Sequence, residues 1–130
     1  MMPDTRVATW RLALCSALFA ATPAWALQTF VVDSSVDQID DDVLDGVCHT
    51  AANTCTLRAA IMQANESTGA GAQIILPPGT YTLAIPASAV DTEFNGDLDL
   101  LPPANGSPVV NIVGAGAATT IVDKQLVAAR

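Results

Sequence analysis

Acidic side chains are the main candidates for chemistry in this chain. The stretch DSSVDQIDDDVLDG, residues 33–46, has six aspartates in fourteen positions. Several carboxylates in one loop could bind Ca²⁺, which prefers a cage of oxygen ligands. The stretch lacks the D-x-D-x-D-G ladder and the final glutamate of an EF-hand, so a solvated acidic turn is the alternative interpretation. The candidate calcium ligands are Asp37, Asp40, Asp42 and Asp45.

A second acidic group lies nearer the C-terminus and consists of Asp91, Glu93, Asp97 and Asp99. Two carboxyl groups can serve as general acid and general base in the cleavage of a polysaccharide. Carboxylates that alternate along a strand more commonly form only its solvated face. The sequence therefore offers a catalytic interpretation of this group beside a structural one.

Cysteine and histidine provide the other reactive groups. Cys15 lies within the N-terminal apolar run, which leaves Cys48 and Cys55 as a pair. In an exported protein an even pair predicts a disulfide, here closing a loop of eight residues. The alternative is a metal site that includes His49, the only histidine, but a fourth ligand is not evident.

A glycine-rich stretch, GAGAAT (residues 114–119), resembles a dinucleotide-binding loop only in part. The third glycine of that motif is missing, and a β-branched run follows where a helix should begin. We therefore predict a turn between two strands.

The N-terminus has the layout of a secretory signal. Residues 1–26 combine two arginines, an apolar run of about ten residues and the motif Ala24-Trp25-Ala26. The run is too short to span a membrane, which takes roughly 20 apolar residues. We therefore expect an exported protein, without a transmembrane span, that begins at Leu27 and acts outside the cytoplasm.

The remainder of the chain is strongly acidic. Residues 27–130 contain three basic and twelve acidic residues. Nucleic acids are poor partners for such a chain, because phosphate binding needs clustered lysine and arginine.

One helix and several strands must position these groups. Thr56 is a candidate N-cap, and Leu57, Ala60, Ile61 and Ala64 follow the spacing of one apolar helix face. Arg58 is expected to pair with an aspartate of the preceding loop. Strands are predicted in TFVV, QIIL, TYTLAI, GDLDLL, VVNIV and TTIV. Ile75, Leu98 and Ile121 are each 23 residues apart, a period that favours stacked coils.

The segment CTLRAAIMQAN (residues 55–65) resembles the Cys-Ser-Leu-Arg-Glu-Ala-Ile signature of the CSLREA-type N-terminal domain of secreted right-handed parallel β-helix proteins. The order of TFVV, DGVC, IILPPGTYTL, GDLDL and NIVGAGAATTIVD extends the resemblance over nearly the whole of residues 27–130. Thr56 and Ala59 depart from the signature at its Ser and Glu positions.

The resemblance implies a mainly β fold, the N-terminal portion of a right-handed parallel β-helix with one short capping α-helix. Residues 27–72 would form the cap, and residues 73–130 the first two coils of a truncated chain. The implied function is a non-catalytic structural cap of an exported surface protein of the adhesion or glycan-binding type. Its partners would be downstream coils, an extracellular glycan or a surface protein. The alternative is a fragment of a carbohydrate-active enzyme, a polysaccharide lyase or hydrolase, with an acidic or calcium site.

Overall fold

The computed structural model describes residues 27–68, 70–88, 92, 94–101 and 109–124. Its elements are, in chain order, β1 (Gln28–Val31), α1 (Leu57–Asn65), β2 (Gly71–Leu76), β3 (Gly79–Leu83), β4 (Val109–Gly114) and β5 (Thr120–Lys124). In this part of the chain, no helix has the length and apolar character needed to cross a bilayer. The predicted secretory signal lies outside the described residues.

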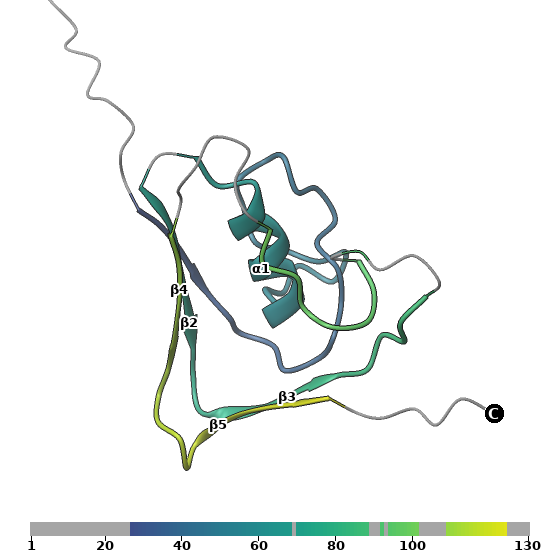
Figure 1. Cartoon of the computed structure of the whole chain (residues 1–130), viewed down its shortest axis with the longest axis vertical. Coiled ribbons are helices and arrows are strands. Elements are labelled where there is room, and N and C mark those ends of the chain that lie inside the picture. The colour runs from purple at the N-terminus through teal and green to yellow at the C-terminus, as the bar shows by residue number, and fades with distance from the viewer. Residues whose placement is uncertain (1–26, 69, 89–91, 93, 102–108, 125–130) are drawn as a thin grey trace, which may run out of the picture.

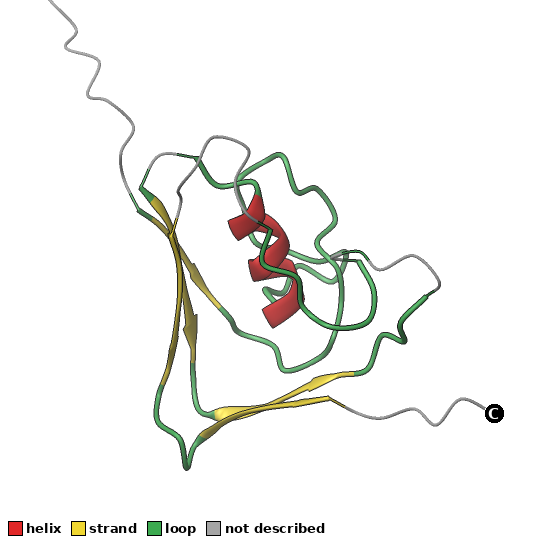
Figure 2. Cartoon of the chain, in the orientation of Figure 1, coloured by secondary structure: helices red, strands yellow, loops and turns green. Residues whose placement is uncertain are grey.

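The strands form two small parallel sheets. One has the order β1-β2-β4 and the other pairs β3 with β5. The sheets meet at an angle, and α1 lies in the corner between them (Figures 1 and 2). The paired strands run in the same direction in all three pairs, β1 with β2, β2 with β4 and β3 with β5, so each pair is joined by a crossover connection.

The core lies between the sheets and the helix. Phe30 of β1 pairs in register with Ile74 of β2, and both are buried against the apolar face of α1. Tyr81 of β3 belongs to the same buried cluster, and its hydroxyl donates a hydrogen bond of 2.8 Å to the carbonyl of Pro77. Each large apolar side chain in such a core contributes on the order of 1.5–3 kcal/mol.

The helix begins as the sequence predicts. Thr56 has an extended backbone, and its hydroxyl oxygen accepts a hydrogen bond of 3.2 Å from the amide of Ala59. The same hydroxyl donates to the carbonyl of Gln38, at 2.6 Å. The predicted apolar face, with Leu57 and Ile61, is buried, but so are Arg58 and Gln63, which flank it.

The predicted fold class was wrong. The described residues form a small α/β domain with five short strands in two small sheets and one helix, and they do not indicate a right-handed parallel β-helix. The helix packs on the inner face of the β1-β2 sheet and forms part of the core, so it does not lie across the end of a stack of coils.

The period of 23 residues was also wrong. Ile75 pairs with Val113 and Thr80 pairs with Ile121, whereas Leu98 belongs to none of the strands. The chain therefore adds its strands at unequal intervals, unlike a coil of fixed length. Segment 96–101, predicted as a strand, runs beside α1 as a strap held by side chains of the helix.

Candidate functional site

A buried ion pair lies between α1 and the acidic loop. Arg58 Nε donates to Asp37 Oδ1 at 2.8 Å, and its NH2 group donates to Asp37 Oδ2 at 3.1 Å. Neither side chain is exposed to solvent. The expected pairing of Arg58 with a loop aspartate is confirmed, and its two-pronged geometry is the strong form of this contact.

The same two side chains hold two further segments. Arg58 donates to the backbone carbonyls of Gly96, at 2.8 Å, and Asp97, at 3.1 Å. Asp37 Oδ2 accepts hydrogen bonds of 2.8 Å from the amides of Ala84 and Ile85, just beyond β3. One ion pair therefore joins the helix, the acidic loop, the end of β3 and the strap.

The environment of Asp37 favours its charged form. Burial acts to raise the pKa of this carboxyl, but the hydrogen bonds from Arg58 and from the two backbone amides, with the positive charge of Arg58, outweigh it. The pKa of Asp37 is therefore lowered. Asp37 serves as a permanent anion in this site, which leaves it unsuited to general acid catalysis near neutral pH.

The remaining candidate calcium ligands surround an amide of the helix. Gln63 Nε2 lies 3.0 Å from Asp40 Oδ1, 2.8 Å from the carbonyl of Asp42 and 3.2 Å from Asp45 Oδ1. Gln63 is buried, and its amide donor occupies the position that a cation would take among these oxygens. Asp37 is held apart from this group by Arg58, so the four predicted ligands do not form one site.

His49 lies between two carboxylates of the same loop. Its Nδ1 is in ion-pair contact with Asp41, although it makes no hydrogen bond, and its Nε2 lies 3.4 Å from Asp45 Oδ2. A hydrogen bond with its own backbone is the largest effect and raises the pKa of His49. Desolvation acts to lower the pKa, but the negative charges of Asp41 and Asp45 raise it further, so the pKa is raised overall. Asp40, Asp41 and His49 could together offer three ligand atoms within 4.8 Å. Both ring nitrogens face carboxylates, an arrangement suited to a protonated imidazolium.

The cysteines are committed to a covalent link. Cys48 and Cys55 form the predicted disulfide, with Cα atoms 5.1 Å apart. The bridge joins the end of the acidic loop to the residue before the helix N-cap, where Asp33 accepts a hydrogen bond of 2.8 Å from the amide of Cys55. Neither thiol is therefore available as a nucleophile or metal ligand.

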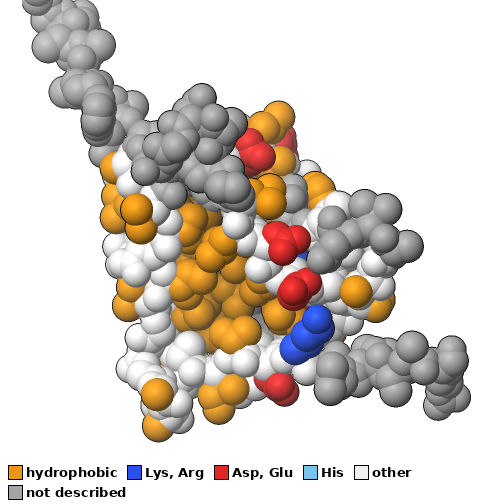
Figure 3. All heavy atoms as spheres, in the orientation of Figure 1, with side chains coloured by type: hydrophobic (Ala, Val, Ile, Leu, Met, Phe, Trp, Pro, Cys, Tyr) orange, Lys and Arg blue, Asp and Glu red, His pale blue; other side chains and the backbone are white. Residues whose placement is uncertain are grey.

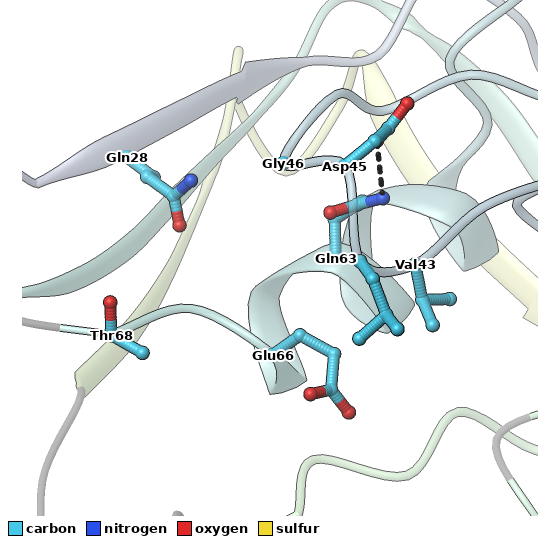
Figure 4. Close-up of a pocket in the computed structure, with 8 residues that line it drawn as sticks. Gln28, Val43, Asp45, Gly46, Gln63, Glu66 and Thr68 are labelled. Carbon is cyan, nitrogen blue, oxygen red and sulfur yellow. Dashed lines mark hydrogen bonds between the residues drawn. The ribbon is translucent and has the colours of Figure 1, made fainter.

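A hollow of about 300 Å³ opens between the acidic loop, α1 and the start of β1. Gln28, Asp45, Glu66 and Thr68 line it, and Gln63 forms part of its wall (Figure 4). The carboxylates of Asp45 and Glu66 point in different directions, so they do not form an acid–base pair (Figure 4).

The second acidic group is only partly described. Asp91 and Glu93 lie outside the described residues. Asp97 and Asp99 belong to the strap and contact α1 through their backbone carbonyls, which accept from Arg58 and Asn65 at 3.1 and 2.9 Å. Their carboxylates make no such contribution to holding the strap.

Two important residues were missed by the sequence analysis, namely Gln63 and Asn65. Asn65 clamps the strap by donating to the carbonyl of Asp99 and accepting from the amide of Leu101, at 3.1 Å. Arg58 and Asn65 lie seven positions apart on one side of the helix. This spacing of two polar residues beside the apolar face is the signal that could have identified Asn65, whereas Gln63 lies on another side of the helix and no local pattern marks it.

Comparisons of the chain with protein-family models, curated proteins and solved structures give no match, so the resemblance to the CSLREA-type domain stays a prediction.

Proposed function

We propose that this protein is a non-catalytic structural module that acts outside the cytoplasm. The observation that carries the proposal is the buried Arg58–Asp37 pair, which uses the charged groups of the helix and of the acidic loop to hold four segments together. Gln63 likewise binds Asp40 of the acidic loop, and the disulfide occupies both Cys48 and Cys55. A disulfide that staples a small domain supports an oxidising compartment.

The alternative function, a polysaccharide lyase or hydrolase, needs a general acid and a general base close to a substrate groove. Among the described residues, Asp37 is bound to Arg58, and most other carboxylates of the acidic loop accept hydrogen bonds from backbone amides or from Gln63. The carboxylates of Asp97 and Asp99 are the remaining candidates for chemistry, because the strap is held by their backbone alone.

The test is an activity assay of the purified protein on a panel of acidic and neutral polysaccharides, with and without Ca²⁺. The proposal predicts no new reducing ends and no unsaturated products. Turnover that the double substitution Asp97→Asn and Asp99→Asn abolishes, while the matched Asp123→Asn does not, would overturn the proposal. These substitutions leave the backbone contacts of Arg58 and Asn65 in place, so lost activity could not be attributed to unfolding.

A further inference from the structure

The core is covered on one side and exposed on the other. Phe30, Ile74 and Ile112 occupy equivalent inward-facing positions on β1, β2 and β4. Their exposed fractions are 6%, 0% and 41%. Tyr81 of β3 is likewise buried, whereas its partner Val122 on β5 is 51% exposed. Strands β4 and β5 therefore carry core-type side chains that nothing in the described chain covers completely.

We define the open end as the inward-facing residues Val110, Ile112 and Val122 together with the free edges of β4 and β5. Within the described sheets, β4 pairs only with β2 and β5 only with β3, so one edge of each strand is unpaired. Apolar side chains gather in the middle of this face, and charged side chains lie along one side of them (Figure 3). A continuous apolar patch next to free strand edges is a typical site of polypeptide association.

We infer that the open end binds a second copy of this chain through a two-fold contact, an inference that rests on the structural role proposed above. Since the opposite side of the core is already buried at Phe30, a head-to-tail contact would leave one apolar face uncovered. A two-fold contact places the open end of each copy on that of the other and covers both. The two β4 edges would then meet antiparallel, because a two-fold rotation reverses the direction of the strand edge that it brings against its copy.

The charges around the open end suit this arrangement. Lys124 occupies the position on β5 that faces the same way as the buried Leu83, and Asp123 is its neighbour. Asp97 and Asp99 lie on the adjoining strap. Each copy supplies one lysine and three acids, so a two-fold rotation can pair Lys124 of each copy with one acid of the other, while the remaining acids stay at the solvated rim. The net charge of −8 opposes random association, but at physiological salt its field is screened beyond about 8 Å.

The required contact is modest in size. A stable interface of standard size buries about 800 Å² per partner. The chain has an accessible surface of 9658 Å², so less than a tenth of it would be needed. The open end extends across both sheets and can contribute the apolar centre of such an interface.

Two matched pairs of substitutions test the inference. Ile112 and Val113 are adjacent on β4 and similarly exposed, at 41% and 39%, but face opposite sides of the sheet. Val122 and Ile121 form the same kind of pair on β5, at 51% and 49%. Sedimentation velocity of the purified protein should show a dimer. Ile112→Asp and Val122→Asp should raise its dissociation constant at least about tenfold. Val113→Asp and Ile121→Asp should change it less than about threefold.

Thermal melting by circular dichroism, performed on each variant, verifies that it is folded. A wild-type protein that stays monomeric up to about 100 μM, where even weak complexes of micromolar affinity form, would overturn the inference. So would equal effects of both members of each pair, or growth into open polymers. A monomer without polysaccharide activity would contradict the two-fold contact and leave the non-catalytic role standing. A stable dimer that turns over a polysaccharide would contradict the non-catalytic role and leave the two-fold contact standing.

Discussion

Replacing Arg58 with methionine should destabilise the protein more than any single change on its surface. Methionine keeps much of the buried volume but removes the donors to Asp37, Gly96 and Asp97. It also leaves the carboxylate of Asp37 buried without its counter-charge. Breaking one partner of a buried ion pair typically costs about 3–5 kcal/mol. For a domain of this size the midpoint of thermal unfolding should fall by more than about 12 °C.

Urea unfolding followed by far-ultraviolet circular dichroism measures this loss, with the fluorescence of Tyr81 as a second probe of the core. Lys124→Met is the matched control, because Lys124 is the other described basic residue and is exposed; both variants are compared in the Ile112→Asp background, in which the proposed two-fold contact is removed. It should change the free energy of unfolding by less than about 0.5 kcal/mol. A loss below about 1 kcal/mol for Arg58→Met, the size expected of an exposed pair, would refute the proposed role of the ion pair.

The remaining predictions concern pH, the amide donor and the disulfide. Because the pKa of Asp37 is lowered, its contribution to stability should be present above its ordinary value of 3.8 and disappear as the pH falls through its folded pKa. Acid titration of the wild type should show this loss, and Asp37→Asn should not. Because the pKa of His49 is raised, its contribution should be complete below 6.5 and lost as the pH rises through the folded pKa, so His49→Gln should flatten the stability profile there. Gln63→Glu should cost about 2 kcal/mol or more at neutral pH, since it removes a buried donor amid three acceptor oxygens, and Gln73→Glu on the outward face of β2 should cost little in the same urea titration. Reduction of Cys48–Cys55 should lower the free energy of unfolding by roughly 2.5 kcal/mol, and an unchanged melting curve would contradict a stabilising bridge.

Local elements were predictable because their signals lie within a few residues. Thr56 followed by the apolar spacing of Leu57 and Ile61 predicted α1, and β-branched runs predicted β2 and β5. The disulfide followed from the even pair of cysteines. Each of these features depends on neighbours in the sequence, so tertiary contacts did not overturn it.

Longer-range organisation was not predictable from periodicity. The alternation of Asp97, Leu98, Asp99 and Leu100 is typical of a strand, yet Arg58 and Asn65 bind backbone carbonyls there and hold the segment as a strap. The predicted stack of coils failed for a related reason: strand partners are chosen by burial around α1, not by equal intervals along the chain.

The acidic loop shows the same limit at the site. Its aspartates predicted a cation, but they meet Arg58 and Gln63 from a helix about 20 residues away. The separations of 21 and 23 residues cannot be read from the loop itself. An amide and a guanidinium on a helix that looks amphipathic are the donors that a search for metal ligands overlooks.

Hydrogen exchange tests most directly the central claim that polar anchors seal one side of the core while the other side is open. It should be measured on Ile112→Asp, the variant predicted to be monomeric. The amides of α1 and β2 should exchange only through global unfolding, whereas those of β4 and β5 should exchange through local opening at least about a hundredfold faster. Equal protection of all four elements, or exchange of α1 before β4, would contradict the account.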